Sequence, residues 1–491
     1  MSVQSPRYEF GPVEQPAMVA GVSGVQVAVV AATLLVAVGV VRAAADAAGF
    51  AVAAAVVVVG VAAAWWPIAG RTPAQWTPIA VGWLWGRLAG RHRLCAATPL
   101  LGLVDGAGSP TPPPTLTGVR ILASDVTASG QRVGIVHDRA AGTYTAVLAV
   151  RGASFELADL DEKVRRLDAW GALLAGLARA ASPVYRLQWV ERTVAADDGD
   201  FVEFLAREGV LGWEHPAHRS YAALVADAGA ATQPHEAFLV VAVSAVAARR
   251  AIRAAGGGDR GAAVVLLREV AALRRDLRAA EISVDGALTP RAVARALRVA
   301  FDPGADVLRP DATVFADEGE AQAWPLATQT TWGAYRSEGA WHATYWIAQW
   351  PRLAVGPDFL AHLLLGTAAL RTVSLTMQPV AADRAAREVE QAITEGLADD
   401  ALRERAGFLA TARQRSRRDA LTRREEELAA GHADYRLSGY VTVTAADLDA
   451  LAVACGEVEQ AAERSRLGLR RLYGQQDVAF TYTLPLARGL R

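Results

Sequence analysis

The residue types best suited to bind a metal lie in WEHPAHRS, Trp213–Ser220. Glu214, His215 and His218 are all residue types found in zinc sites. Two histidines three residues apart could share one face of a helix, but Pro216 lies between them. No second cluster in the sequence supplies the further ligands that such a site needs. We therefore predict no metal site here.

A second group of possible ligands lies in VAADDGDF, Val194–Phe201, which contains Asp197, Asp198 and Asp200. Carboxylates bind calcium, but the spacing of a calcium loop and its final glutamate are both missing. We interpret this segment as a solvated turn.

Motifs for nucleotide or covalent chemistry are also missing from the sequence. A nucleotide motor holds phosphates with a glycine loop followed by a lysine. Lys163 lies in the helical stretch LDEKVRRL without such a loop, and the glycine-rich Gly256–Gly261 has no lysine and no GxGxxG spacing. No GxSxG, HExxH or Cys–His pairing occurs. We predict that the protein is not an enzyme, has no catalytic, cofactor-binding or metal-binding residue, and does not hydrolyse ATP.

Aromatic residues gather in WHATYWIAQWPR, Trp341–Arg352. They could stack on a ligand, but the alternation typical of a strand places Trp341, Ala343, Tyr345 and Ile347 on one face. His342, Thr344, Trp346 and Ala348 then face the other way. Aromatic residues at a period of two favour packing within a sheet over ligand binding. Pro351 should end the strand because it cannot donate a hydrogen bond to the ladder.

Overall composition excludes several classes of protein. The chain has 491 residues, enough for two or three domains, and a hydrophobic content of 52%. A net charge of −1 gives no global field that would attract nucleic acid. Cys95 and Cys455 lie far apart without a partner motif, which indicates a reducing compartment rather than a disulfide scaffold.

Two uncharged segments near the N-terminus are long enough to cross a bilayer as helices. They are Gly21–Val41 and Phe50–Gly70, separated by the short break Arg42–Gly49. A cleaved signal peptide followed by a buried helix is the alternative. It is disfavoured because about twenty residues precede the first segment and no basic n-region is present. We predict a transmembrane helical hairpin.

Basic and aromatic residues flank the second segment. Arginines outnumber acidic residues after it, and the positive-inside rule then predicts a multi-pass protein of the cell membrane with both termini cytoplasmic. We interpret Gln75–Leu88 as a segment lying along the inner leaflet. Packing of its tryptophans against the soluble domain is an equal alternative. The predicted membrane-interface residues are Trp65, Trp66, Arg71, Trp76, Arg87, Arg91 and Arg93.

Beyond the Pro-rich stretch Gly106–Thr115 the chain alternates strands and helices, which predicts an α/β (α+β) fold. The two halves of this region run in the same order of strand-like segments, so we predict two similar cytoplasmic repeats with mixed sheets. The arginine-rich run Arg413–Arg424 is balanced by Glu425–Glu427 and is interpreted as a solvated helical face rather than a DNA contact. The predicted divisions are a cytoplasmic tail (1–20), the transmembrane hairpin (21–70), an interfacial segment (71–105), a linker (106–115), repeat 1 (116–302) and repeat 2 (323–491).

The order of GVRILASD, RVGIVHD, GTYTAVLAVRG and VYRLQWVER resembles the N-terminal domain of type IV secretion and conjugative-transfer ATPases of the VirB and TraC kind. The segments WHATYWIAQWPRLAVGPDFL and YGQQDVAFTYTLPL extend this resemblance. YEFGPVEQP, the hydrophobic hairpin and RTPAQW resemble the two-span PrgI-like membrane component of Gram-positive (actinobacterial) conjugation systems. The resemblance implies a non-catalytic, membrane-anchored subunit. It would sit in an oligomeric complex and dock a separately encoded conjugative or secretion ATPase, and it leaves direct contact with nucleic acid open.

Two alternatives of other classes stay open. One is a membrane subunit of a type VII secretion system, which can also join two spans to a cytoplasmic α/β domain. The other is a membrane-bound enzyme of an unrecognised kind, which would need a pocket with converging polar groups.

Overall fold

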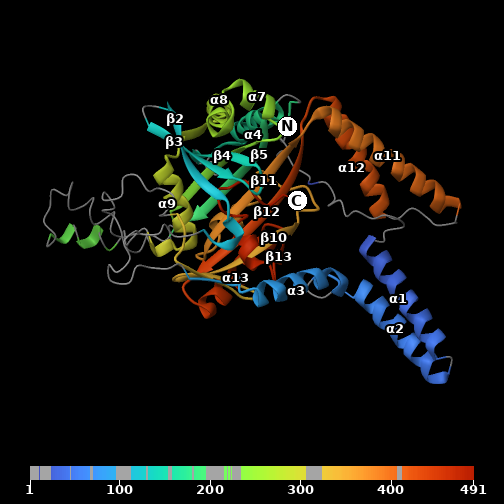
Figure 1. Cartoon of the computed structure of the whole chain (residues 1–491). Coiled ribbons are helices and arrows are strands. Elements are labelled where there is room, and N and C mark those ends of the chain that lie inside the picture. Colours follow the sequence, from blue (N-terminus) through green and yellow to red (C-terminus); the bar gives the residue numbers. More distant parts are fainter. Residues whose placement is uncertain are drawn as a thin grey trace. The chain divides into compact units, whose positions relative to one another are not determined.

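The structure is a computed structural model, and all structural statements below refer to the residues that it describes (Figure 1). These are residues 10, 24–44, 46–66, 70–95, 112–128, 131–152, 158–179, 182–194, 215–217, 219–221, 223, 234–305, 323–405 and 412–490. The chain divides into two compact units. The sheet unit comprises Met1–Phe10, His92–Glu388 and Arg424–Arg491, and the helical unit comprises Gly11–Arg91 and Val389–Arg423.

The helical unit contains the two apolar segments as helices α1 (Gly24–Ala43) and α2 (Ala47–Trp65). Both are long and apolar enough to cross a membrane. The break between them is shorter than predicted, because Asp46 starts α2 early: its side chain accepts a hydrogen bond of 2.7 Å from the Gly49 N–H. Helix α3 (Pro73–Leu88) follows.

Helices α11 (Ala382–Arg405) and α12 (Ala412–Ala429) form the predicted helical region before the last long strand. Arg415, Arg418 and Arg423 of α12 are exposed, as expected for a solvated helical face. Each helix runs from one unit into the other.

The sheet unit is built around one sheet of thirteen strands, and every pairing between described strands is antiparallel. The strands run in the order β1-β8-β9-β10-β12-β11-β5-β6-β4-β3-β2, with β13 beside β10 and β7 beside β4. Their bounds are β1 Arg93–Cys95, β2 Val119–Ala128, β3 Gln131–Asp138, β4 Thr143–Gly152, β5 Val184–Thr193, β6 His235–Ser244, β7 Ile282–Ala287, β8 Ala327–Thr330, β9 Tyr335–Ser337, β10 Ala340–Gln349, β11 Leu370–Val380, β12 Asp434–Ala445 and β13 Gly468–Arg471.

The prediction of mixed sheets is therefore wrong, and the chain path explains why. Helix α4 (Leu160–Leu177) connects β4 to β5, and such a crossover brings two strands parallel to each other. These two strands do not pair, because β6 lies between them and runs antiparallel to both. In the second half, β12 lies in the same way between β10 and β11, which are connected through the short α10 (Ala361–Leu365). This is a split β-α-β arrangement.

Strands β5 and β11 join the two halves into this one sheet. They pair antiparallel from Thr372, opposite Arg192, to Met377, opposite Leu187. At the end of the seam the Thr193 hydroxyl accepts a hydrogen bond of 2.7 Å from the Arg371 N–H and donates one of 2.9 Å to the Arg371 carbonyl.

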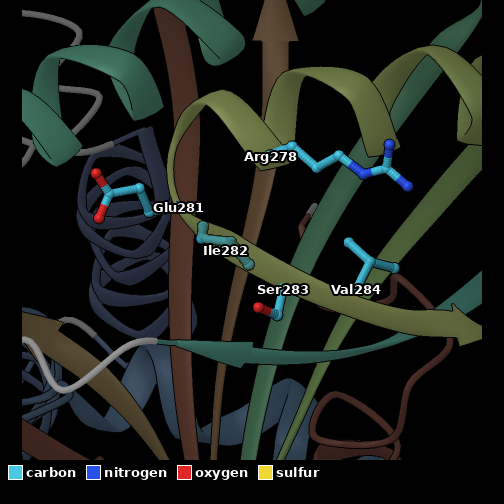
Figure 2. A pocket seen from close by; sticks show the side chains of 5 residues that line it. All are labelled: Arg278, Glu281, Ile282, Ser283 and Val284. Carbon is cyan, nitrogen blue, oxygen red and sulfur yellow. The ribbon is translucent and has the colours of Figure 1, made fainter.

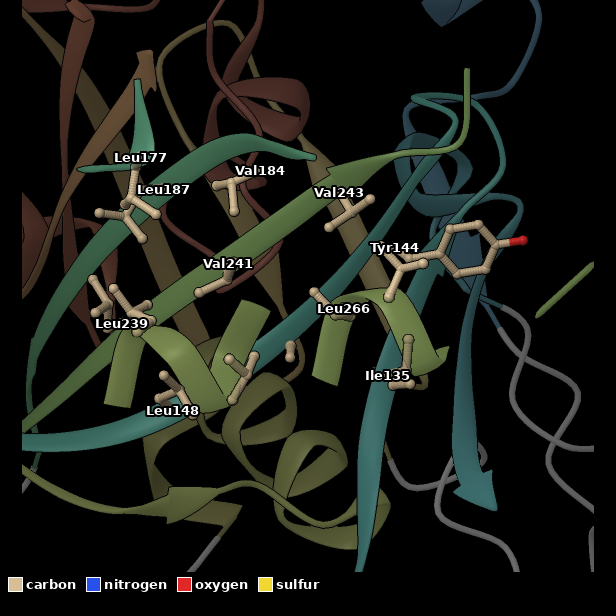
Figure 3. Close-up of a cluster of buried hydrophobic side chains, with 14 of the residues drawn as sticks. Ile135, Tyr144, Leu148, Leu177, Val184, Leu187, Leu239, Val241, Val243 and Leu266 are labelled. Atoms are coloured by element: carbon tan, nitrogen blue, oxygen red, sulfur yellow. The ribbon is translucent and has the colours of Figure 1, made fainter. Parts of the chain in front are cut away.

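One face of the sheet, here called the helix face, is apolar along its length. In the first half, alternate residues of β4, β5 and β6 pack against α4 and α8 (Gly258–Ala279), as Figure 3 shows for Leu148, Leu187, Val241 and Leu266. In the second half, Ala343, Tyr345 and Ile347 of β10 pack against α13 (Leu448–Arg464). Because side chains alternate between the two faces of a strand, every second residue of these strands points into one of the two apolar clusters.

The opposite face, here called the strap face, is covered in two ways. Over the first half lies α9 (Pro290–Phe301), whose buried residues pack on β4, β5 and β6. This helix was not predicted from the sequence, although Thr289 caps it and Pro290 is its first residue. Over the central strands lies the C-terminal strap, defined as Gln476–Leu490, which begins with α14 (Gln476–Phe480).

Buried polar side chains of the central strands hold this strap. The Gln188 amide nitrogen lies within 3.1 Å of the Ser374 Oγ and the Tyr482 and Leu484 carbonyl oxygens, and its oxygen accepts from the Ala487 N–H at 2.7 Å. Thr376 and Tyr440 donate to the carbonyls of Arg488 and Gly489. Several main-chain groups of the strap thus pair with side chains of the central strands, in addition to backbone bonds within the strap itself.

The aromatic stretch at Trp341 is strand β10, as predicted, and the faces also match the prediction. Tyr345 is fully buried on the helix face. Trp346 is only half-buried, between Tyr440, Leu472 and Tyr482 on the strap face, with the Arg470 guanidinium over its ring. Loss of the Trp346 ring should therefore cost less than loss of a fully buried ring.

His342 is completely buried on the strap face among polar partners. Its Nε2 lies 2.6 Å from the Ser337 Oγ and 3.1 Å from the Phe301 carbonyl, and its Nδ1 lies 2.9 Å from the Thr444 Oγ1. These contacts fit a neutral ring that donates from Nε2 and accepts from Thr444. Burial lowers the pKa of His342 to about 4.

We predict that Gln188→Ala destabilises the sheet unit by about 2–4 kcal/mol, because carbonyls of the strap lose a buried donor. The measurement is thermal unfolding of the full-length protein in detergent, followed by tryptophan fluorescence. Gln460→Ala, on the exposed surface of α13, is the matched control and should leave the transition unchanged. Equal transitions for both variants would show that the strap does not depend on Gln188.

We predict that His342 makes the protein sensitive to acid. Because the folded-state pKa lies below the ordinary value of 6.5, the unfolded chain binds the proton first and stability falls as pH drops below 6.5. The loss between pH 6.5 and 5 should be on the order of 2 kcal/mol. His342→Gln should flatten this part of the stability–pH curve, whereas His362→Gln, at an exposed position, should not. Parallel curves for wild type and His342→Gln would contradict the prediction.

Candidate membrane-anchoring site

Small residues form the contact between α1 and α2. A Cβ added at Gly60 would lie 2.3 Å from the Thr33 hydroxyl, so only glycine allows the two helices to approach so closely here. Ala37, Ala53 and Ala64 are also buried. The Gln26 side chain donates a hydrogen bond of 3.0 Å to the Ala64 carbonyl across the pair. Small residues and interhelical hydrogen bonds are typical of helix pairs in membranes.

Large apolar side chains of the same helices point outward. Leu35 is 75% exposed, Val58 is 68% exposed and Phe50 is 58% exposed. A soluble helix pair would bury these residues and expose its small ones. The arrangement therefore fits a hydrocarbon surrounding rather than water.

Trp65 and Trp66 lie at the end of α2, as predicted, and both are exposed. Trp65 is the last helical residue, and the Trp66 N–H donates a hydrogen bond of 2.8 Å to the Ala62 carbonyl. Two exposed indoles at the end of an apolar helix suit the interface between hydrocarbon and headgroups.

Gln75–Leu88, interpreted from the sequence as an interfacial segment, lies within helix α3. Pro73 is its first residue, and the Gln75 side chain accepts from the Thr72 N–H at 3.2 Å. The Arg71 guanidinium lies 5.4 Å from the ring of Trp76, and that of Arg87 lies 5.5 Å from the ring of Trp83, as cation–π contacts. The predicted interface residues Arg71 and Trp76 thus lie together at the start of α3, and Arg87 lies at its end.

An exposed apolar stripe on α3 was not singled out from the sequence. Val81, Leu84, Trp85 and Leu88 follow the helical spacing of three, four and seven residues and are 61%, 52%, 68% and 75% exposed. The half-buried residues Trp76, Ile79 and Trp83 lie on the opposite side of the helix. The stripe could have been predicted from the helical period of the apolar residues. The positions of tryptophan and arginine alone do not distinguish the two faces of the helix. The stripe is a face suited to lie in a membrane interface.

The last two predicted interface residues lie in different units. Arg91 is exposed and belongs to the helical unit, whereas Arg93 opens β1 and pairs opposite Gln329 of β8 in the sheet unit.

The residues considered for chemistry do not assemble into a site within the described part of the chain. His215 accepts a hydrogen bond from the Ala217 N–H, while Glu214, His218 and the three aspartates at 197, 198 and 200 lie outside the described residues. No group of three or more His, Cys, Asp or Glu placed to hold a metal occurs among the residues searched. Lys163 lies inside α4.

The glycine-rich segment makes a tight turn between α7 (Arg249–Ala254) and α8. Gly256, Gly257 and Gly258 all have positive φ, and the Gly257 N–H donates 2.8 Å to the Ile252 carbonyl.

One open hollow of about 420 Å³ lies where α8 meets β7 (Figure 2). Its two charged side chains, Arg278 and Glu281, point away from one another. The Glu281 carboxylate is engaged by Arg166 of α4 at 2.8 Å. The polar groups of this hollow do not converge on a point where a reacting atom could sit.

A cluster of titratable side chains outside these segments holds the β3–β4 hairpin against the start of α8. The Tyr144 hydroxyl donates a hydrogen bond of 2.7 Å to Asp259, and the His137 ring stacks on Tyr144 with 4.2 Å between ring centroids. Burial and the Asp259 carboxylate raise the pKa of Tyr144 to about 12. Burial lowers the pKa of His137, so the cluster is neutral apart from the carboxylate.

Comparison with known proteins gives one family match. Residues 231–347 match the family model of EccE, described as a type VII ESX secretion system translocon. The match covers about a quarter of the chain, from the segment before β6 to near the end of β10. No curated protein matches the chain. The match points to a membrane subunit of a secretion system.

This finding overturns the resemblance to a type IV secretion or conjugative-transfer ATPase and the assignment to conjugation. That resemblance was based on the order of strands and helices alone. The same order is compatible with many α/β domains, since it follows from the covering of a sheet by helices and carries no site-specific residues.

We predict that the apolar stripe of α3 contacts lipid. A nitroxide label at Leu88→Cys, in a Cys95→Ser background in nanodiscs, should be relaxed by oxygen more than by an aqueous nickel chelate. The matched control is Leu448→Cys on α13, which replaces a leucine that is also exposed and should favour nickel. Preference for nickel at position 88 would mean that the stripe faces water or a wet partner surface.

Proposed function

We propose that the protein is an EccE-type membrane subunit of a type VII secretion translocon. The observation that carries this proposal is the family match at residues 231–347, joined in one chain to two apolar helices. The matched region includes β6 and the helices α8 and α9, which cover opposite faces of the sheet. The proposal adopts the type VII alternative that the sequence left open.

In this role the helical hairpin anchors the protein in the cell membrane, and both termini lie in the cytoplasm. Two features support this topology. Phe10 precedes the apolar helices and His92 follows them, and both belong to the sheet unit, which supports a hairpin with both ends on the same side of the membrane. Arg71, Arg87 and Arg91 follow α2, while the turn holds one arginine and one aspartate, and this asymmetry favours the cytoplasmic side.

The proposed role is structural rather than catalytic. The protein would assemble with other translocon subunits as part of an oligomeric complex, and energy for transport would come from a separate subunit. The missing phosphate-binding loop and the diverging charges of the hollow beside α8 support this view. The outward apolar stripe of α3 and the exposed helices α11 and α12 offer surfaces for lipid and for partner subunits.

We also propose that the sheet unit consists of two repeats, at 116–302 and 323–491. Support comes from the strand pairings: β6 lies between β4 and β5 as β12 lies between β10 and β11. Strand β7 joins β4 as β13 joins β10, and hairpin β3–β4 corresponds to hairpin β9–β10. With two such repeats, the two ends of the sheet would be comparable parts of one scaffold.

The proposal is tested by purifying the tagged full-length protein from native membranes and identifying the co-purified proteins. We expect other subunits of a type VII translocon to be enriched at least tenfold over a control with an unrelated two-span protein. Enrichment of conjugation proteins, or of no membrane complex, would contradict it.

Topology is tested separately, with a reporter fused after Arg93 or at the C-terminus. An extracytoplasmic signal from either fusion would contradict the orientation without affecting the assignment to a secretion system.

A further inference from the structure

A residue from before the first apolar helix is seated on the second half of the sheet unit. The ring of Phe10 stacks on Trp350, with 5.0 Å between ring centroids and 27° between planes. It also contacts Phe359 at 5.3 Å in a tilted arrangement. All three rings are half-buried. Such aromatic contacts stabilise a docked segment beyond the effect of buried area alone.

The two partner rings are held by the sheet and not by the tail. Trp350 follows the last residue of β10, and Pro351 after it is buried. A Cβ added at Gly439 of β12 would lie 3.1 Å from the Trp350 Cζ2 and 2.6 Å from the Ile347 Cδ1. Because Gly439 has no side chain, the Trp350 indole can lie close to β12 at this position. Trp350 and Phe359 both pack on the helix-face cluster that contains Tyr345 and Leu363.

The chain returns to the same half of the sheet after the apolar helices. Strand β1, Arg93–Cys95, pairs antiparallel with β8, opposite Ala327–Gln329. The segment 11–91 is thus flanked by attachments to the second half of the sheet unit at both ends, by an aromatic contact of Phe10 and by backbone pairing of β1. A contact that closes so long a segment must outweigh the entropy of loop closure, which grows only slowly with length.

We propose that Trp350 and Phe359 form a docking cradle whose occupant is Phe10 of the same chain, so that residues 11–91 are closed into a loop at the sheet unit. The cradle binds an aromatic ring through two uncharged aromatic side chains, so binding does not require a charged group on the occupant. It holds Phe10 on the side of the membrane on which the sheet unit lies, independently of flanking arginines. The inference does not require the chain to be a type VII subunit.

The test places a photoreactive benzoylphenylalanine at position 10 of the full-length protein in native membranes. Irradiation should give an intramolecular adduct at the mass of one chain, mapped by mass spectrometry to the peptide that contains Trp350 and Phe359. Trp350→Ala should lower the yield about 2- to 10-fold, in line with the loss of one aromatic pair. The matched control Leu353→Ala, at an exposed position three residues away, should leave the yield unchanged.

Three results would overturn the proposal: an adduct mapped elsewhere, an adduct at the mass of two chains or of a partner complex, and a yield unaffected by Trp350→Ala. A second variant covers the case in which Trp350→Ala fails to fold. Phe10→Ala leaves the sheet core intact and should raise hydrogen exchange of the backbone around Trp350 and Phe359, while Phe10→Trp should restore protection. Unchanged exchange in Phe10→Ala would show that the tail does not occupy the cradle.

Discussion

The side-chain amide of Gln188 holds together three parts of the sheet unit that lie far apart in sequence. It belongs to β5. Its nitrogen donates to Ser374 of β11 and to carbonyls of the C-terminal strap, while its oxygen accepts from the Ala487 N–H of the strap. On the strap face, side chains of the central strands form a row of buried polar groups, among them Thr376 and Thr442, beneath the strap. A buried polar row is costly unless every group is paired, and the strap supplies the partners. The union of the two halves at β5–β11 thus depends on a segment at the other end of the chain.

In the helix pair α1–α2 of the helical unit, the usual distribution of side chains between inside and outside is reversed. There the small residues Gly60, Ala53 and Ala64 are inside and the large apolar ones are outside. A hydrocarbon surrounding favours this arrangement, because it removes the advantage of burying leucine and valine. Helix α3 combines both distributions, with half-buried Trp76 and Trp83 on one side and the stripe Val81, Leu84, Trp85 and Leu88 on the other. Where the chain leaves the helical unit for the sheet unit, β1 pairs with β8.

The sequence pattern misled where it was read as a family signature. The succession of strands and helices that resembled a conjugative ATPase domain is what the covering of an antiparallel sheet by helices requires, and it contains no residue dedicated to that activity. The match to EccE lies in residues 231–347, which include the α8 and α9 layers. Function is therefore better argued from the membrane hairpin and this matched region than from element order.

By itself the sequence determined the two apolar helices, the strands with a period of two, the long polar helices before β12 and the faces of β10. Each of these follows from local patterns of apolar and polar residues, which need no knowledge of distant contacts. It did not reveal α9, the single antiparallel sheet, the stripe on α3 or the seat of Phe10 on Trp350. Local patterns cannot show which strand inserts between β4 and β5, because pairing partners are chosen by packing across the whole unit. Only the tertiary structure decided these points: the energy of pairing β6 between β4 and β5, and of stacking Phe10 on Trp350, comes from residues far apart in the chain.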